Sequence, residues 1–69
     1  MTCDEKERLA NEYEATTAKF LEAVRQLQRD MGTSTKAEYE RLRLASDEAR
    51  VGSERARLAL EQHVAAHQC

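Results

Sequence analysis

The chain contains no proline and only two glycines, Gly32 and Gly52, in 69 residues. Proline and glycine are the residues that most often interrupt or end a helix. Most of the remaining positions carry Ala, Glu, Arg, Leu and Gln, which are strong helix formers. A sequence with so few interruptions is suited to long helices, and it therefore predicts an all-α fold.

Signals for the beginning and end of a helix divide the chain once. Thr2 with Glu5 has the spacing of an N-terminal capping box, in which each side chain satisfies a free backbone N–H. Gly32 follows the last apolar residue of the first stretch, where a glycine in the left-handed conformation usually ends a helix. These signals predict a first helix over about 3–31.

A second start signal follows directly. Thr35 and Glu38 form another capping box, with Ser34 as an alternative cap. We therefore predict a single domain over 1–69 with a turn over 32–35 and a second helix over about 36–67. Because so short a connection joins neighbouring antiparallel helices, the predicted fold is a two-helix hairpin.

The first helix has apolar side chains at two heptad positions. One row contains Ala10, Thr17, Val24 and Met31, and the other contains Tyr13, Phe20 and Leu27. The flanking positions are also apolar at Leu9, Leu21 and Ala23. One seam between two helices needs only two heptad positions, so this wider stripe indicates contact with more than one neighbour.

The second helix carries three rows of residues spaced seven apart, with Tyr39 and Leu60 at the edge of the arc. The rows are Ala37, Leu44, Val51, Leu58 and Ala65; Ala45, Gly52, Ala59 and Ala66; and Leu42, Ala49 and Ala56. Small side chains allow a second helix to approach closely. An interior glycine costs about 1 kcal/mol relative to alanine, so we expect Gly52 to mark the closest approach. The alternative is a tolerated glycine on a solvated face.

A lone hairpin of this size buries too little apolar surface to offset the entropy of ordering the chain. Because no disulfide or metal site is clearly encoded, we predict a homodimer that forms a four-helix bundle. A lone hairpin, a higher assembly and docking on a larger, unidentified protein are the alternatives. The predicted interface consists of Leu42, Ala45, Ala49, Gly52, Ala56, Ala59 and Leu60.

A row of cations spaced seven apart, Lys36, Arg43, Arg50 and Arg57, suggests an alternative function as a small nucleic-acid-binding adaptor. However, the net charge is −2, so no basic excess draws the chain to nucleic acid or anionic lipid. Three acidic residues also precede the arginines by three positions, where ion pairs form on a helix. They are Glu40, Asp47 and Glu54. We therefore favour a solvated ion-pair face.

Near the two chain ends, Cys3, His63, His67 and Cys69 form a set of side chains that zinc accepts. This set defines a second alternative, a metal- or thiol-dependent module, and a Cys3–Cys69 disulfide is a third arrangement. We favour unliganded ends and expect no cofactor, because no Cys-x-x-Cys spacing is present and Cys69 is the last residue.

No catalytic arrangement is recognisable. Ser34, Ser46 and Ser53 have no histidine in helical register, and no glycine-rich phosphate loop occurs. No apolar run approaches the ~18 residues of a membrane span. The charged start differs from a secretory signal, so we expect a cytoplasmic protein with free thiols. The sequence predicts a non-enzymatic module that acts by helix–helix association.

Overall fold

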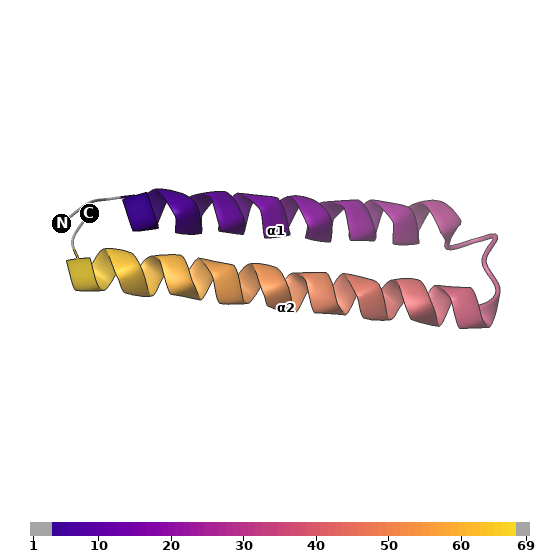
Figure 1. The fold of residues 1–69 in the computed structure, drawn as a ribbon. Coiled ribbons are helices and arrows are strands. Elements are labelled where there is room, and N and C mark those ends of the chain that lie inside the picture. The colour runs from indigo at the N-terminus through magenta and orange to yellow at the C-terminus, as the bar shows by residue number, and fades with distance from the viewer. Residues whose placement is uncertain (1–3, 68–69) are drawn as a thin grey trace.

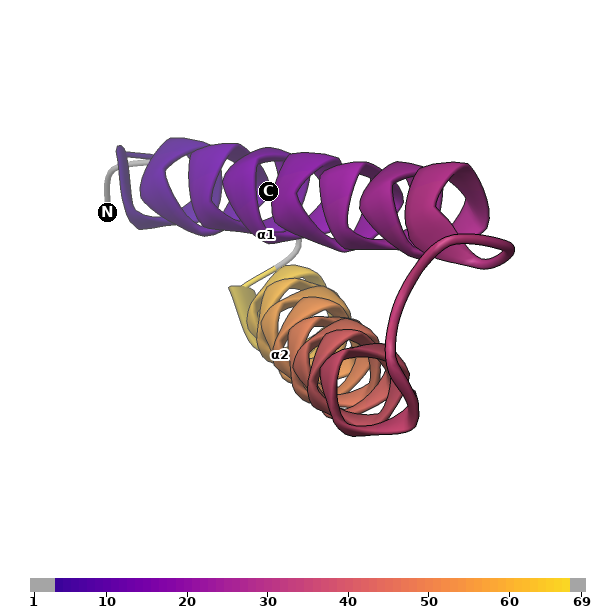
Figure 2. The same cartoon turned by 90° about the vertical axis from the view of Figure 1, so that its right-hand side faces the viewer.

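The computed structural model describes residues 4–67, which form two helices joined by a short turn. Helix α1 spans Asp4–Asp30 and helix α2 spans Lys36–His67. The helices run antiparallel and side by side, with the start of α1 and the end of α2 at the same end of a rod of 52 × 13 × 10 Å (Figure 1). Seen from one end, the two axes are inclined to each other (Figure 2). The prediction of an all-α, two-helix hairpin is confirmed.

The start of α2 uses the predicted cap. The Glu38 backbone N–H donates to Thr35 Oγ1 at 3.1 Å, and the Tyr39 N–H donates to the Thr35 carbonyl at 2.9 Å. The side chain thereby satisfies one of the N–H groups that a helix start leaves without a partner, and the Thr35 carbonyl accepts the first bond of the helix itself. The predicted start of the first helix and the Thr2–Glu5 capping box lie outside the described residues.

The end of α1 differs from the predicted one. Gly32 does not adopt the left-handed φ that was expected of it. Instead, the Asp30 carbonyl accepts the N–H of Thr33 at 3.1 Å, the N–H of Ser34 at 2.9 Å and the Ser34 hydroxyl. Because these donors already satisfy the last carbonyl of the helix, no left-handed residue is required. Ser34 thus closes α1 and Thr35 caps α2.

The contact between the helices is a single narrow seam. Only Leu42, Ser46 and Ala56 are buried among the described residues, all on one face of α2, and no residue of Asp4–Asp30 is buried. The predicted core row of α1 is half-buried, except for Met31 beside the turn, which is exposed. The hairpin therefore has a seam, without an enclosed core of its own.

One hydrogen bond crosses the middle of the seam. The hydroxyl groups of Thr17 and Ser53 lie 2.9 Å apart. In an antiparallel pair this contact places Tyr13 near the level of Ala56 and Phe20 near the level of Ala49. Both aromatic side chains of α1 are half-buried, and at these levels α2 carries small residues, which leave room for large neighbours.

We expect Thr17→Val to lower the free energy of unfolding by ~1 kcal/mol, because it leaves the Ser53 hydroxyl without its partner across the seam. Ser53→Ala should have a similar cost, and the double variant should cost less than the sum of the two single variants. Urea denaturation followed by circular dichroism measures all three. Strictly additive costs would show that the hydroxyl pair does not hold the register.

Candidate helix-docking surface

Large apolar side chains lie on the outside of the hairpin. Leu44, Val51 and Leu58 are 51%, 39% and 45% exposed, and they form one row along α2. Leu21 and Met31 are also exposed, at 48% and 59%. By comparison, the only buried apolar residues of the described chain are Leu42 and Ala56. The hairpin thus leaves more large apolar groups in water than it buries.

A groove runs between the helices along one side of the seam. It consists of two adjoining hollows of about 300 and 380 Å³, which share Thr16 of α1 and Gly52 of α2. Leu9, Ala56 and Ala59 also line the first hollow, and Ala45 and Ala49 also line the second. We call this feature the Thr16–Gly52 groove. Its lining is mostly small and apolar, which makes it a surface that a helix can approach closely.

The predicted interface residues divide between the seam and this groove. Leu42 is buried against α1 and Leu60 is half-buried, and neither lines the groove. The other five line it: Ala45, Ala49, Gly52, Ala56 and Ala59. Ala56 is buried at the floor of the groove, whereas Ala45, Ala49, Gly52 and Ala59 lie on its accessible surface. The role of this surface as an interface stays a prediction.

Gly52 does not mark the closest approach of the two helices within the hairpin. A Cβ atom built at this position would meet no heavy atom within 4 Å. The expectation is therefore wrong for the contact with α1, because α2 turns Ser53 and Ala56 toward α1 and leaves Gly52 beside the seam. For a second chain, the close approach at Gly52 stays a prediction.

Four charged residues line the groove, and the sequence analysis did not select them. Glu12 and Arg55 line the first hollow, while Lys19 and Glu48 line the second. Within each helix the two charges are seven residues apart and opposite in sign. That spacing is visible in the sequence, but only the pairing of the helices shows which charges share a groove.

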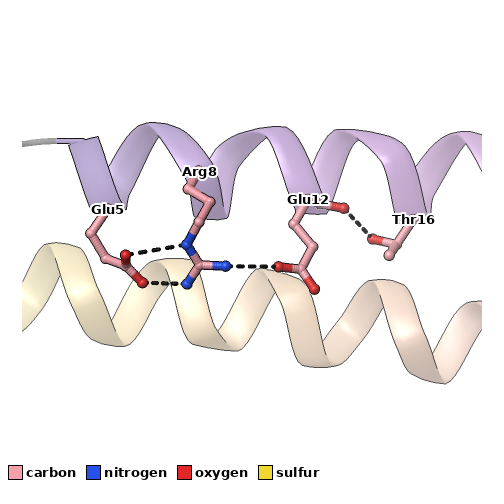
Figure 3. Close-up of polar contacts among 4 residues, drawn as sticks. All are labelled: Glu5, Arg8, Glu12 and Thr16. Carbon is pink, nitrogen blue, oxygen red and sulfur yellow. Dashed lines mark hydrogen bonds and ion pairs between the residues drawn. The ribbon is translucent and has the colours of Figure 1, made fainter.

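Glu12 also belongs to a chain of charges along α1 (Figure 3). Arg8 donates to Glu5 and lies 3.5 Å from the Glu12 carboxylate. The hydrogen bond from Arg8 is the largest cause that lowers the pKa of Glu5 below its ordinary value, and the charges of Arg8 and His63 act in the same direction. Thr16 donates its hydroxyl to the Glu12 carbonyl at 2.9 Å, so this hydroxyl needs no partner from another chain.

Two of the three ion pairs expected along the arginine row of α2 are present. Arg43 is 3.1 Å from Glu40 and 3.2 Å from Asp47. Arg57 is 2.9 Å from Glu54 and 2.6 Å from Glu61. The predicted pairing of Asp47 with Arg50 is not among the ion pairs of residues 4–67, because Asp47 pairs with Arg43.

The exposed ion pairs should give a modest loss of helix stability in acid. The hydrogen bond from Arg57 is the largest cause that lowers the pKa of Glu54 below its ordinary value of 4.5. A depressed folded-state pKa contributes stability above the unfolded pKa, and this contribution is lost as the pH falls through the folded value. We expect circular dichroism to show decreasing thermal stability below pH ~4.5. Arg57→Gln should reduce this dependence, and an unchanged acid profile would contradict the role of the pair.

The two histidines near the end of α2 lie together. The ring centroids of His63 and His67 are 4.5 Å apart, and His63 Nε2 has no hydrogen-bond partner among the described residues. No group of three or more metal-binding side chains occurs within residues 4–67. Cys3 and Cys69 lie outside the described residues, so the four-residue metal or disulfide arrangements stay predictions.

Neither helix of the described chain is sufficiently long and apolar to cross a membrane. Comparison with protein-family models, with curated proteins and with solved structures found no match.

Proposed function

We propose that this protein is a non-catalytic helical hairpin that acts by helix–helix association, and that its first partner is a second copy of itself. The observation that carries the proposal is the imbalance between buried and exposed apolar groups. Two apolar residues are buried among residues 4–67, whereas five large ones are exposed. None of these five lines the Thr16–Gly52 groove, so they show that the hairpin leaves apolar surface uncovered. The groove adds the small-residue surface that a dimer with the architecture of a four-helix bundle would bury.

The solvent-accessible surface area of the chain supports the same proposal. A folded protein of 7.9 kDa exposes about 4,400 Å² by the usual scaling of surface with mass. This chain exposes 5237 Å², or about 800 Å² more than that scaling gives. A standard stable interface buries about 800 Å² on each partner. The surplus is therefore of the size that one dimer interface covers.

The alternative functions have less support. A nucleic-acid adaptor would need the arginines of α2 to contact phosphates, but Arg43 and Arg57 are each held by two carboxylates. Steep salt dependence of binding to DNA would be its signature. A metal module is favoured only by the proximity of His63 and His67, and two imidazoles are fewer than the ligands of a structural zinc site.

Sedimentation equilibrium of the full chain tests self-association directly. We expect a mass of twice 7.9 kDa at micromolar concentration, with or without reductant, because the proposed contact is non-covalent. Dilution should reduce both the mass and the helical content together, since the seam within one hairpin is small. A folded chain that stays monomeric at micromolar concentration would contradict the proposal.

Gly52→Leu should convert the dimer to monomer without reducing the helix propensity of α2. Leucine is a better helix former than glycine by nearly 1 kcal/mol, and the hairpin itself leaves space at this position. A leucine there would hold a second helix away from the groove. Ala15→Leu, at an exposed position of α1, is the matched control and should leave the mass unchanged. Equal dimer fractions for wild type and Gly52→Leu would place the interface elsewhere.

A further inference from the structure

We infer that the Thr16–Gly52 groove seats a second copy of this chain about a two-fold axis that passes between Thr16 and Gly52. This inference rests on the proposed self-association and adds the surface and the symmetry of the pairing. Its support is the pattern of side chains in the groove and on its rim.

The floor of the groove is arranged about its own centre. Thr16 and Gly52 belong to both hollows and therefore mark the middle. On α2, Ala45 and Ala59 lie seven residues before and after Gly52. The end-over-end two-fold rotation, which sets α2 against α2, therefore places Ala45 against Ala59 of the second copy, whereas the rotation about the long axis sets Gly52 against Thr16. Backbones can approach closely there, as they do in other small-residue helix contacts.

The four charged residues that line the groove form its rim, one at each of its four corners, and their signs alternate around it. They are Glu12, Lys19, Glu48 and Arg55. At the first hollow, Glu12 of α1 lies across the groove from Arg55 of α2. At the second hollow, Lys19 of α1 lies across from Glu48 of α2. Each corner therefore differs in sign from the next corner along its own helix and from the corner across the groove.

This pattern is complementary to itself under either two-fold rotation that lays one groove on another. If the second copy is turned end over end, Glu12 meets Lys19 of the second copy and Glu48 meets Arg55 of the second copy. If it is turned about the long axis, Glu12 meets Arg55 and Lys19 meets Glu48 of the second copy. Opposite charges meet in both dockings, and each contact occurs twice because of the symmetry.

Three of the four rim charges are available for such contacts. Lys19, Glu48 and Arg55 take part in none of the ion pairs of residues 4–67, whereas Glu12 already forms an exposed ion pair with Arg8 at 3.5 Å. The opposite side of α2 is less suitable, because Arg43 and Arg57 are already neutralised there. The outer row of Leu44, Val51 and Leu58 offers only one apolar side chain in every two helical turns. The groove therefore combines small side chains, a symmetric arrangement and charges that can pair with a second copy.

Reversal of one rim charge tests the inference. Glu48→Arg should raise the dimer dissociation constant by roughly tenfold or more, because it creates two like-charge contacts in either docking. The control is Glu14→Arg, which has the same change in charge but lies by a separate hollow of α1, outside the groove. Sedimentation equilibrium at low salt measures both variants. Equal effects of the two variants would overturn the inference.

Two double variants then test the partner of Glu48. If the chains pair end over end, Glu48→Arg with Arg55→Glu restores the dimer, whereas Glu48→Arg with Lys19→Glu does not. If they pair about the long axis, the second double variant restores the dimer and the first does not. Restoration by one of the two supports the groove and identifies the rotation. Failure of both to restore dimerisation overturns the inference.

The results separate this inference from the proposed function. A wild-type chain that sediments as a folded monomer overturns both. A wild-type dimer that responds to Gly52→Leu and to rim reversals no more than to the control variants retains self-association but excludes the Thr16–Gly52 groove as its surface.

Discussion

The structure depends on one seam between two long helices, in which half-buried side chains of α1 pack against the buried Leu42, Ser46 and Ala56 of α2. The Thr17–Ser53 hydroxyl pair marks how the two helices are positioned along each other. In this position the aromatic residues of α1 are close in height along the rod to alanines of α2. Close packing across such a seam fixes which face of each helix points inward. Every exposed feature of the molecule, including the groove and its rim, follows from that choice of faces.

The same seam explains why the hairpin has interaction surface left over. Two antiparallel helices cover only one stripe on each other, whereas the apolar and small residues of α2 extend around a wider arc. Leu42 and Ala56 occupy the covered stripe, and Gly52 lies beside it. Many of the charges are exposed and form ion pairs with neighbours on their own helix, so they keep the remaining surface solvated without adding much stability. This uncovered arc is the surface that the proposed self-association would use.

Much of the fold could be predicted because its determinants are local. The absence of proline, the Thr35 cap and the heptad spacing of Tyr13 and Phe20 indicate two helices and the inward face of α1. Gly32 was interpreted wrongly because the Ser34 hydroxyl and two backbone N–H groups satisfy the Asp30 carbonyl without a left-handed residue. Such competition among nearby donors depends on geometry that residue spacing does not specify.

The surface was harder to predict because α2 has several stripes that a partner helix could cover. Sequence periodicity grouped Leu42 and Gly52 in one interface, but the hairpin buries the first and leaves the second beside the groove. The amino-acid sequence by itself determined the two helices, their lengths and their antiparallel connection, because propensities, caps and loop length act over a few residues. Only the tertiary structure decided which stripe of α2 faces α1 and which four charges border one groove, because these depend on contacts between residues far apart in the chain.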